Sequence, residues 1–163
     1  MLRAAALLLT TLASVSAVSY PNLQPGAQIK LSSSALNYSG QLIQVSWSGI
    51  YNPTVNDAIL LQTPANESLS TQFPVRYRWA SQTASYPTGA GTFTFKVLNE
   101  RAPIIFLYLR NVTVGTNGTV EWGEDDAPTG FQDTDVVAAS PVLTLLAPNE
   151  PTHVHMSYTD TEG

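Results

Sequence analysis

The segment Val45–Leu61 places the tightest limits on how this chain folds. Ile43, Val45 and Trp47 alternate with polar residues, which is the period-two pattern of a strand with one face in a core and one in water. A tryptophan on the apolar side of a strand buries a large area, and its indole N–H usually finds a hydrogen-bond partner. We therefore expect Trp47 in the core of the fold.

The residues that follow predict a turn and a second strand. Gly49 ends the first strand, and Asn52-Pro53 turns the chain, because proline fixes its own φ and biases the preceding residue away from helix. Ala58–Leu61 is short and wholly apolar, as in a buried strand. We interpret the segment as a hairpin whose role is structural.

Similar short segments recur along the chain with turn residues between them, and no window shows a capped helical period. Ile104–Leu109 is apolar on both faces, which predicts a central strand. Thr63–Phe73 is predicted to be a loop. The other expected strands are Ile29–Leu31, Pro74–Trp79, Phe93–Val97, Val136–Ala139 and Val142–Leu146.

This pattern predicts an all-β fold, an antiparallel β-sandwich of the immunoglobulin or fibronectin III kind. The chain has 163 residues, 44% of them hydrophobic, which suffices for one core. Cysteine is absent, so the immunoglobulin disulfide cannot form and the fibronectin III-like variant remains. We assign residues 18–147 to this sandwich.

Residues 1–17 have the features of a secretory signal peptide. Arg3 supplies the positive charge, Ala4–Leu12 the apolar stretch, and Val15-Ser16-Ala17 the small residues of a cleavage site. The apolar stretch is shorter than the about 20 residues of a membrane span, and no later stretch is longer. We expect a secreted protein whose mature chain starts near Val18.

Potential N-glycosylation sites agree with that route. Four asparagines stand in Asn-x-Ser/Thr, and Asn52 is excluded because proline follows it. The predicted glycosylation sites are Asn37, Asn66, Asn111 and Asn117.

The charge of the chain argues against a nucleic-acid partner, because its formal net charge is -5 and its pI is near 4.7. Much of the acidic charge lies in Val114–Thr134, which we interpret as a long surface loop. Clustered carboxylates there would suit calcium, but the spacing of an EF-hand is missing, so a solvated loop is the preferred interpretation.

No catalytic, cofactor-binding or metal-binding residue is assigned. His153-x-His155 presents two rings on one strand face, but no third ligand is evident and an exposed strand is the simpler interpretation. No Gly-x-Ser-x-Gly segment marks a serine nucleophile.

The Pro74–Trp79 strand offers two further candidates for binding. Arg76 and Arg78 would suit an anion but are expected on its wet face, with Val75, Tyr77 and Trp79 opposite. Tyr77 and Trp79 would suit a sugar ring but are expected in the core.

Residues 148–163 are predicted to be a linker and the first strand of a second module. The strand is expected over His153–Tyr158, and the chain stops where a partner strand would follow. A truncated protein is therefore expected, with this unpaired strand as a docking edge.

Several segments together resemble the N-terminal fibronectin-like region of plant-type purple acid phosphatases. Val45-Ser46-Trp47-Ser48-Gly49, followed by Asn52-Pro53 and Asp57, is similar to that family's Val-x-Trp-x-Gly, Asn-Pro and Asp-Trp-Ile-Gly, although Ala58 and Leu60 replace its Trp and Gly. Further similar segments follow in order: Phe73–Ala80, Thr88–Arg101, Val136–Ser140 and Pro151–Asp160.

The resemblance implies a parent enzyme that hydrolyses phosphate monoesters at acid pH with a dinuclear Fe–M(II) centre. That centre belongs to a metallophosphatase domain whose motifs, such as Gly-Asp-x-x-Tyr and Gly-Asn-His-Glu, do not occur here, so this chain holds no cofactor itself. The implied partner is that domain in the parent chain, or a second copy in a homo-oligomer. The alternative function is a stand-alone secreted β-sandwich that binds glycan or protein.

Overall fold

The computed structural model describes residues 18–72, 74–99, 101–113 and 130–145, and most of the regular secondary structure within them is β-strand. Short 3-10 turns occupy Ala80–Gln82, Tyr86–Thr88 and Asp133–Asp135. The expected strands form, although the last one, predicted over Val142–Leu146, has only two strand residues and its residue 146 lies outside the described residues; a short strand at Ala35–Leu36 is added. The strands are β1 (Gln28–Leu31), β2 (Ala35–Leu36), β3 (Gln41–Ser48), β4 (Ala58–Gln62), β5 (Arg76–Trp79), β6 (Gly91–Val97), β7 (Ile105–Leu109), β8 (Val136–Ala139) and β9 (Thr144–Leu145).

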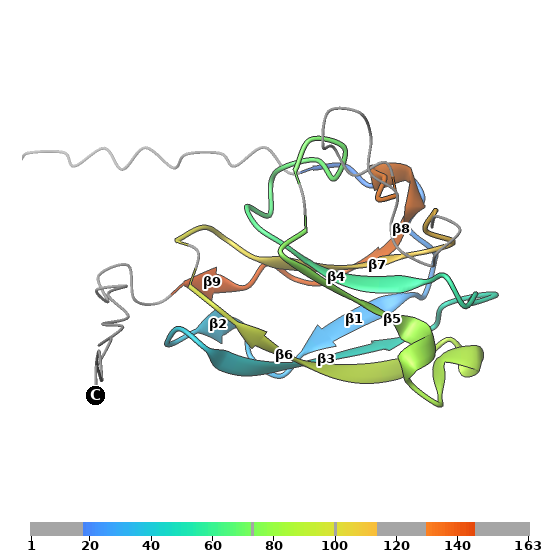
Figure 1. Ribbon diagram of the computed structural model, residues 1–163, viewed down its shortest axis with the longest axis horizontal. Helices are drawn as coiled ribbons and strands as arrows, with labels where there is room; N and C mark the ends of the chain where they lie inside the picture. Colours follow the sequence, from blue (N-terminus) through green and yellow to red (C-terminus); the bar gives the residue numbers. More distant parts are fainter. Residues whose placement is uncertain (1–17, 73, 100, 114–129, 146–163) are drawn as a thin grey trace, which may run out of the picture.

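Two antiparallel sheets lie face to face (Figure 1). One has the order β1-β3-β6 and the other the order β5-β4-β7-β8. A third, two-stranded sheet pairs β2 with β9 in parallel, which departs from the all-antiparallel expectation. The predicted central strand is confirmed, since β7 lies between β4 and β8.

The predicted hairpin between the strands of Trp47 and Leu60 is wrong, because β3 and β4 belong to different sheets. β4 pairs with β5 and β7, and the connection after β3 crosses from one sheet to the other. Every residue of β4 is buried, whereas β3 buries only one face. A strand buried on both faces needs a paired strand at each edge and apolar cover over each face. Within the second sheet, β5 and β7 pair with the two edges of β4.

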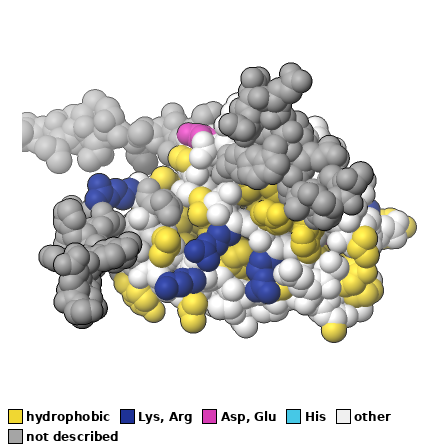
Figure 2. Space-filling model, in the orientation of Figure 1, with side chains coloured by type: hydrophobic (Ala, Val, Ile, Leu, Met, Phe, Trp, Pro, Cys, Tyr) yellow, Lys and Arg dark blue, Asp and Glu magenta, His cyan; other side chains and the backbone are white. Residues whose placement is uncertain are grey.

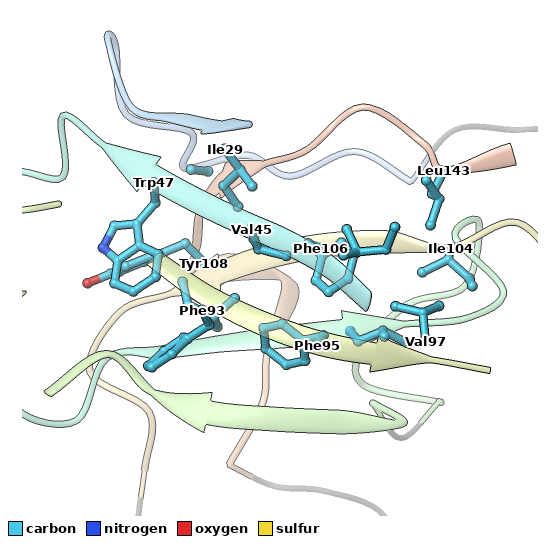
Figure 3. Packing of buried hydrophobic residues seen from close by; sticks show 14 of the residues in the cluster. Ile29, Val45, Trp47, Phe93, Phe95, Val97, Ile104, Phe106, Tyr108 and Leu143 are labelled. Carbon is cyan, nitrogen blue, oxygen red and sulfur yellow. The ribbon is translucent and has the colours of Figure 1, made fainter. Parts of the chain in front are cut away.

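Trp47 lies in the core between the sheets, as predicted, with 3% of its surface exposed. Figure 3 shows its indole beside the rings of Phe93 and Tyr108, whose centroids are 5.2 and 6.0 Å away. A Cβ at Gly91, its register partner, would lie 2.2 Å from the indole, so only glycine fits there. The indole N–H is buried without a hydrogen-bond partner, contrary to expectation.

A second apolar cluster covers the outer face of the four-stranded sheet. Leu60 and Leu107 supply its floor, while Leu69 and Phe131, which come from connecting segments, lie over it. The predicted loop at 63–73 is confirmed over its described residues, and it is this loop that buries the second face of β4 and β7.

The predicted alternation along β5 is confirmed in part. Arg76 and Arg78 share one face and are exposed, as predicted, with Tyr77 and Trp79 on the other. Tyr77 stands opposite Leu60 on the outer face and stays 40% exposed, so its expected place in the core is wrong, while Arg78 stands opposite Ile59 on the side of the inner core. The Arg78 guanidinium lies 4.1 Å from the centroid of Phe93. Because β5 is an edge strand, a long cationic side chain can close the open end of the core and still reach water.

Truncation of the core tryptophan should destabilise the fold strongly. Trp47→Ala is expected to lower the free energy of unfolding by about 3–5 kcal/mol, because it removes a buried ring and leaves a cavity. Urea unfolding followed by far-UV circular dichroism measures the loss.

Leu42→Ala is the matched control, since Leu42 is on the same strand and 64% exposed. It should change the free energy by less than about 0.5 kcal/mol. Equal losses in the two variants would contradict the two-sheet core.

Candidate functional site

The carboxylate of Asp57 is fully buried where the crossing segment enters β4. It accepts hydrogen bonds from the Thr54 N–H at 3.0 Å and the Thr54 hydroxyl at 2.6 Å. It also accepts from the Tyr108 hydroxyl at 2.9 Å and from the Asn111 N–H at 3.0 Å. Four donors on one buried carboxylate form a satisfied polar network.

This network joins segments that are far apart in the sequence. The Asp57 backbone also accepts the Ala80 N–H at 2.8 Å, which ties the end of β5 to the same point. Burial, and secondarily the charge of Asp57, raise the pKa of the Tyr108 phenol above its ordinary value of 10.0. The carboxylate has no access to solvent or substrate, so its role is structural. The Thr-x-x-Asp spacing of Thr54 and Asp57 was a sequence signal for this turn.

The sequon asparagines that the structure describes are accessible. Asn37, Asn66 and Asn111 are each exposed on connecting segments, as an acceptor for a glycan must be, while Asn117 lies outside the described residues. Whether any of them carries sugar stays a prediction.

Asn66 lines a pocket of about 400 Å³ on the outer face of the four-stranded sheet. Its walls include Tyr20, Ala65, Pro103, Ile105 and Val142. The sequence offered no signal for this pocket, because its lining comes from four separate segments.

The two turns at this pocket are fixed to each other by hydrogen bonds. The Ala65 N–H donates to the Pro103 carbonyl at 2.9 Å, and the Thr63 hydroxyl donates to the same carbonyl at 3.2 Å. The Asn66 backbone therefore has a defined place beside Pro103.

Tyr20 lines this pocket, but its hydroxyl has no accessible surface and, among the described residues, no hydrogen-bond partner. Burial, with a smaller effect of Asp133, raises the pKa of Tyr20 to about 12. The phenol is therefore a neutral donor at physiological pH.

Most of the acidic and histidine candidates for metal binding lie outside the described residues, so only Asp133 and Asp135 can be placed. Asp133 accepts hydrogen bonds from the Ser68 hydroxyl at 2.5 Å and the Leu69 N–H at 2.9 Å, so this carboxylate holds the covering loop. Residues 114–129 of the acidic loop, and His153 and His155, lie outside the described residues. Within 18–72, 74–99, 101–113 and 130–145, no three His, Cys, Asp or Glu side chains converge. The described residues therefore do not fit a dinuclear iron centre.

Three candidates on β5 (Tyr77, Arg78 and Trp79) contact other parts of the protein, whereas Arg76 is exposed. Arg78 donates from Nε to the Gln82 side-chain oxygen at 3.3 Å, in addition to its contact with Phe93. Tyr77 packs edge-on against Trp79 and Phe131. Figure 2 shows Lys and Arg side chains gathered on the face that carries β5 and β6.

Comparison with known proteins points to the purple acid phosphatases at low similarity. The chain is 24% identical over 144 residues to an Arabidopsis thaliana protein named "Probable inactive purple acid phosphatase 9". The match covers 82% of this chain but only 20% of that protein, so the chain spans about a fifth of its relative's length. No family profile and no solved structure matches the chain.

Among the described residues, no helix has the length and apolar character needed to cross a bilayer.

Loss of the buried Asp57 carboxylate should destabilise the fold. Asp57→Ala is expected to lower the free energy of unfolding by about 3 kcal/mol, because it leaves the buried Tyr108 hydroxyl and the part-buried donors of Thr54 and Asn111 without an acceptor. Urea unfolding measures it. Glu67→Ala, at an exposed carboxylate, is the control and should cost less than about 0.5 kcal/mol. A similar cost for both would contradict the structural role.

The Tyr108 phenol should make stability fall at alkaline pH. Its folded pKa is raised above 10.0, so its contribution is complete below pH 10 and is lost as the pH rises toward the folded pKa, because only the unfolded chain then ionises freely. Tyr108→Phe should therefore show a shallower decline of the free energy of unfolding above pH 10. Tyr51→Phe, at an exposed position, controls for loss of a hydroxyl; an unchanged slope in Tyr108→Phe would refute the assignment.

Proposed function

We propose that this chain is the non-catalytic N-terminal region of a secreted purple acid phosphatase-like protein, with a fibronectin III-like sandwich over residues 18–147. The observation that carries the proposal is the relative that matches most of this chain with a fifth of its own length. The ordered motifs around Trp47 and Asp57 support it, because Trp47 forms the core and Asp57 the buried network of the sandwich. The relative's name contains the word inactive, which is compatible with a family member that does not act as a phosphatase.

In this proposal, residues 1–17 direct secretion and residues 148–163 form the linker and first strand of the next module. The dinuclear Fe–M(II) centre and the hydrolysis of phosphate monoesters belong to a metallophosphatase domain of the parent protein. The sandwich supports that domain by packing beside it, or it forms the interface of a homo-oligomer. Its rigid two-sided sheet suits a supporting role, because interface geometry is kept when the backbone is held by a packed core.

The second candidate is a stand-alone secreted module that binds glycan or protein. The free edge of β5 favours it, because Val75 and Tyr77 are partly exposed there next to Arg76. Transcripts in which this region continues into Gly-Asp-x-x-Tyr and Gly-Asn-His-Glu would favour the supporting role over this one.

The purified chain should not act as a phosphatase. Incubated with p-nitrophenyl phosphate at acid pH and with iron, zinc or manganese added, it is expected to release no more nitrophenol than buffer, because none of its described residues converge on a metal. A complete purple acid phosphatase in the same assay is the positive control. Turnover together with stoichiometric iron in the purified chain would overturn the proposed function.

A further inference from the structure

We propose that the first N-acetylglucosamine of a glycan on Asn66 lies in the apolar pocket beside this residue and stabilises the fold. The proposal rests on the secretion that the proposed function includes. Its occupant is the protein's own covalently attached sugar.

The acceptor asparagine stands at the pocket itself. Asn66 is exposed, heads the sequon Asn66-Glu67-Ser68, and itself lines the pocket. A sugar on its side chain begins at the pocket and is held there by a covalent bond. Such tethering raises the effective concentration, so that a contact too weak for a free sugar can form.

The walls of the pocket fit a sugar ring. Pro103, Ile105 and Val142 present carbon surface, and Val142 is 45% exposed. The C–H face of a pyranose ring and the methyl of its acetamido group would remove that surface from water. The volume of about 400 Å³ lies in the range of about 300–1,000 Å³ usual for pockets that hold small ligands.

Tyr20 adds to these carbon walls. It lines the pocket, but its hydroxyl has no accessible surface, so it offers a docked sugar carbon surface and no hydrogen-bond donor. The sugar therefore meets apolar walls and keeps its own hydroxyl groups toward water.

The turn that carries Asn66 is held by hydrogen bonds. Ala65 is bonded to the Pro103 carbonyl, and the Glu67 N–H donates to the Pro64 carbonyl at 3.3 Å. Since the turn is ordered before the sugar docks, little backbone entropy is lost on contact.

The test compares two sequons in the full chain, made with its own N-terminal segment in a eukaryotic secretory host. Peptide mass spectrometry first measures occupancy at Asn66 and Asn37. Asn66→Gln is expected to lower Tm by roughly 3–6 °C, and Asn37→Gln, whose residue does not line the pocket, by less than about 1 °C. An endoglycosidase that leaves one N-acetylglucosamine on each asparagine should leave Tm unchanged.

Unglycosylated chain made in bacteria separates the sugar from the substitution. There, Asn66→Gln should leave Tm unchanged. Val142→Ser removes part of the apolar wall and should lower Tm more in the glycosylated chain than in the bacterial one.

Three results would overturn the proposal: no glycan at Asn66, an equal Tm change at Asn66 and Asn37, or the same effect of Val142→Ser in both hosts. The last result would indicate that another segment of the chain fills the pocket. Phosphatase turnover by the chain would contradict the proposed non-catalytic role and would leave this contact intact, so the two failures are distinguishable.

Discussion

The buried carboxylate of Asp57 is the interaction on which the arrangement of the two sheets depends. The chain leaves one sheet after β3 and enters the other at β4, and Asp57 stands at that entry. Its donors come from the crossing segment, from β7 and from the segment after β7. Removal of this acceptor would leave a crossing without a fixed end, because apolar packing alone does not specify which way a connection turns.

Local patterns predicted the strands well and their pairing poorly. The alternation at Trp47 and the double apolar face at Leu107 report burial directly, and both were confirmed. The sheet to which β4 belongs is decided by the Asp57 network and by pairing with β7, far along the chain, which periodicity does not encode. Tyr77 was mispredicted as a core residue for a related reason: on an edge strand a side chain is covered from one side only. β4 also extends one residue beyond the predicted strand, to Gln62, because this polar side chain is wholly buried and breaks the expected pattern.

The candidate site was predictable only in part. Asn66 was predicted as a glycan acceptor, and the structure adds the pocket at its side, whose walls meet only after folding. Tyr20 could not have been chosen from the sequence, because an isolated tyrosine near the start of a domain carries no pattern. The resemblance to purple acid phosphatases rests on motifs that build the scaffold, and scaffold residues do not report chemistry.

The loop that lies over the outer face of the four-stranded sheet has a consequence for proteolysis. Leu69 covers Leu60 and Leu107, which belong to the middle strands of that sheet. A single cut by a protease between residues 66 and 72 would loosen this cover and expose apolar surface on an otherwise intact protein. Damaged copies would then adhere to one another and leave solution before their remaining core had unfolded.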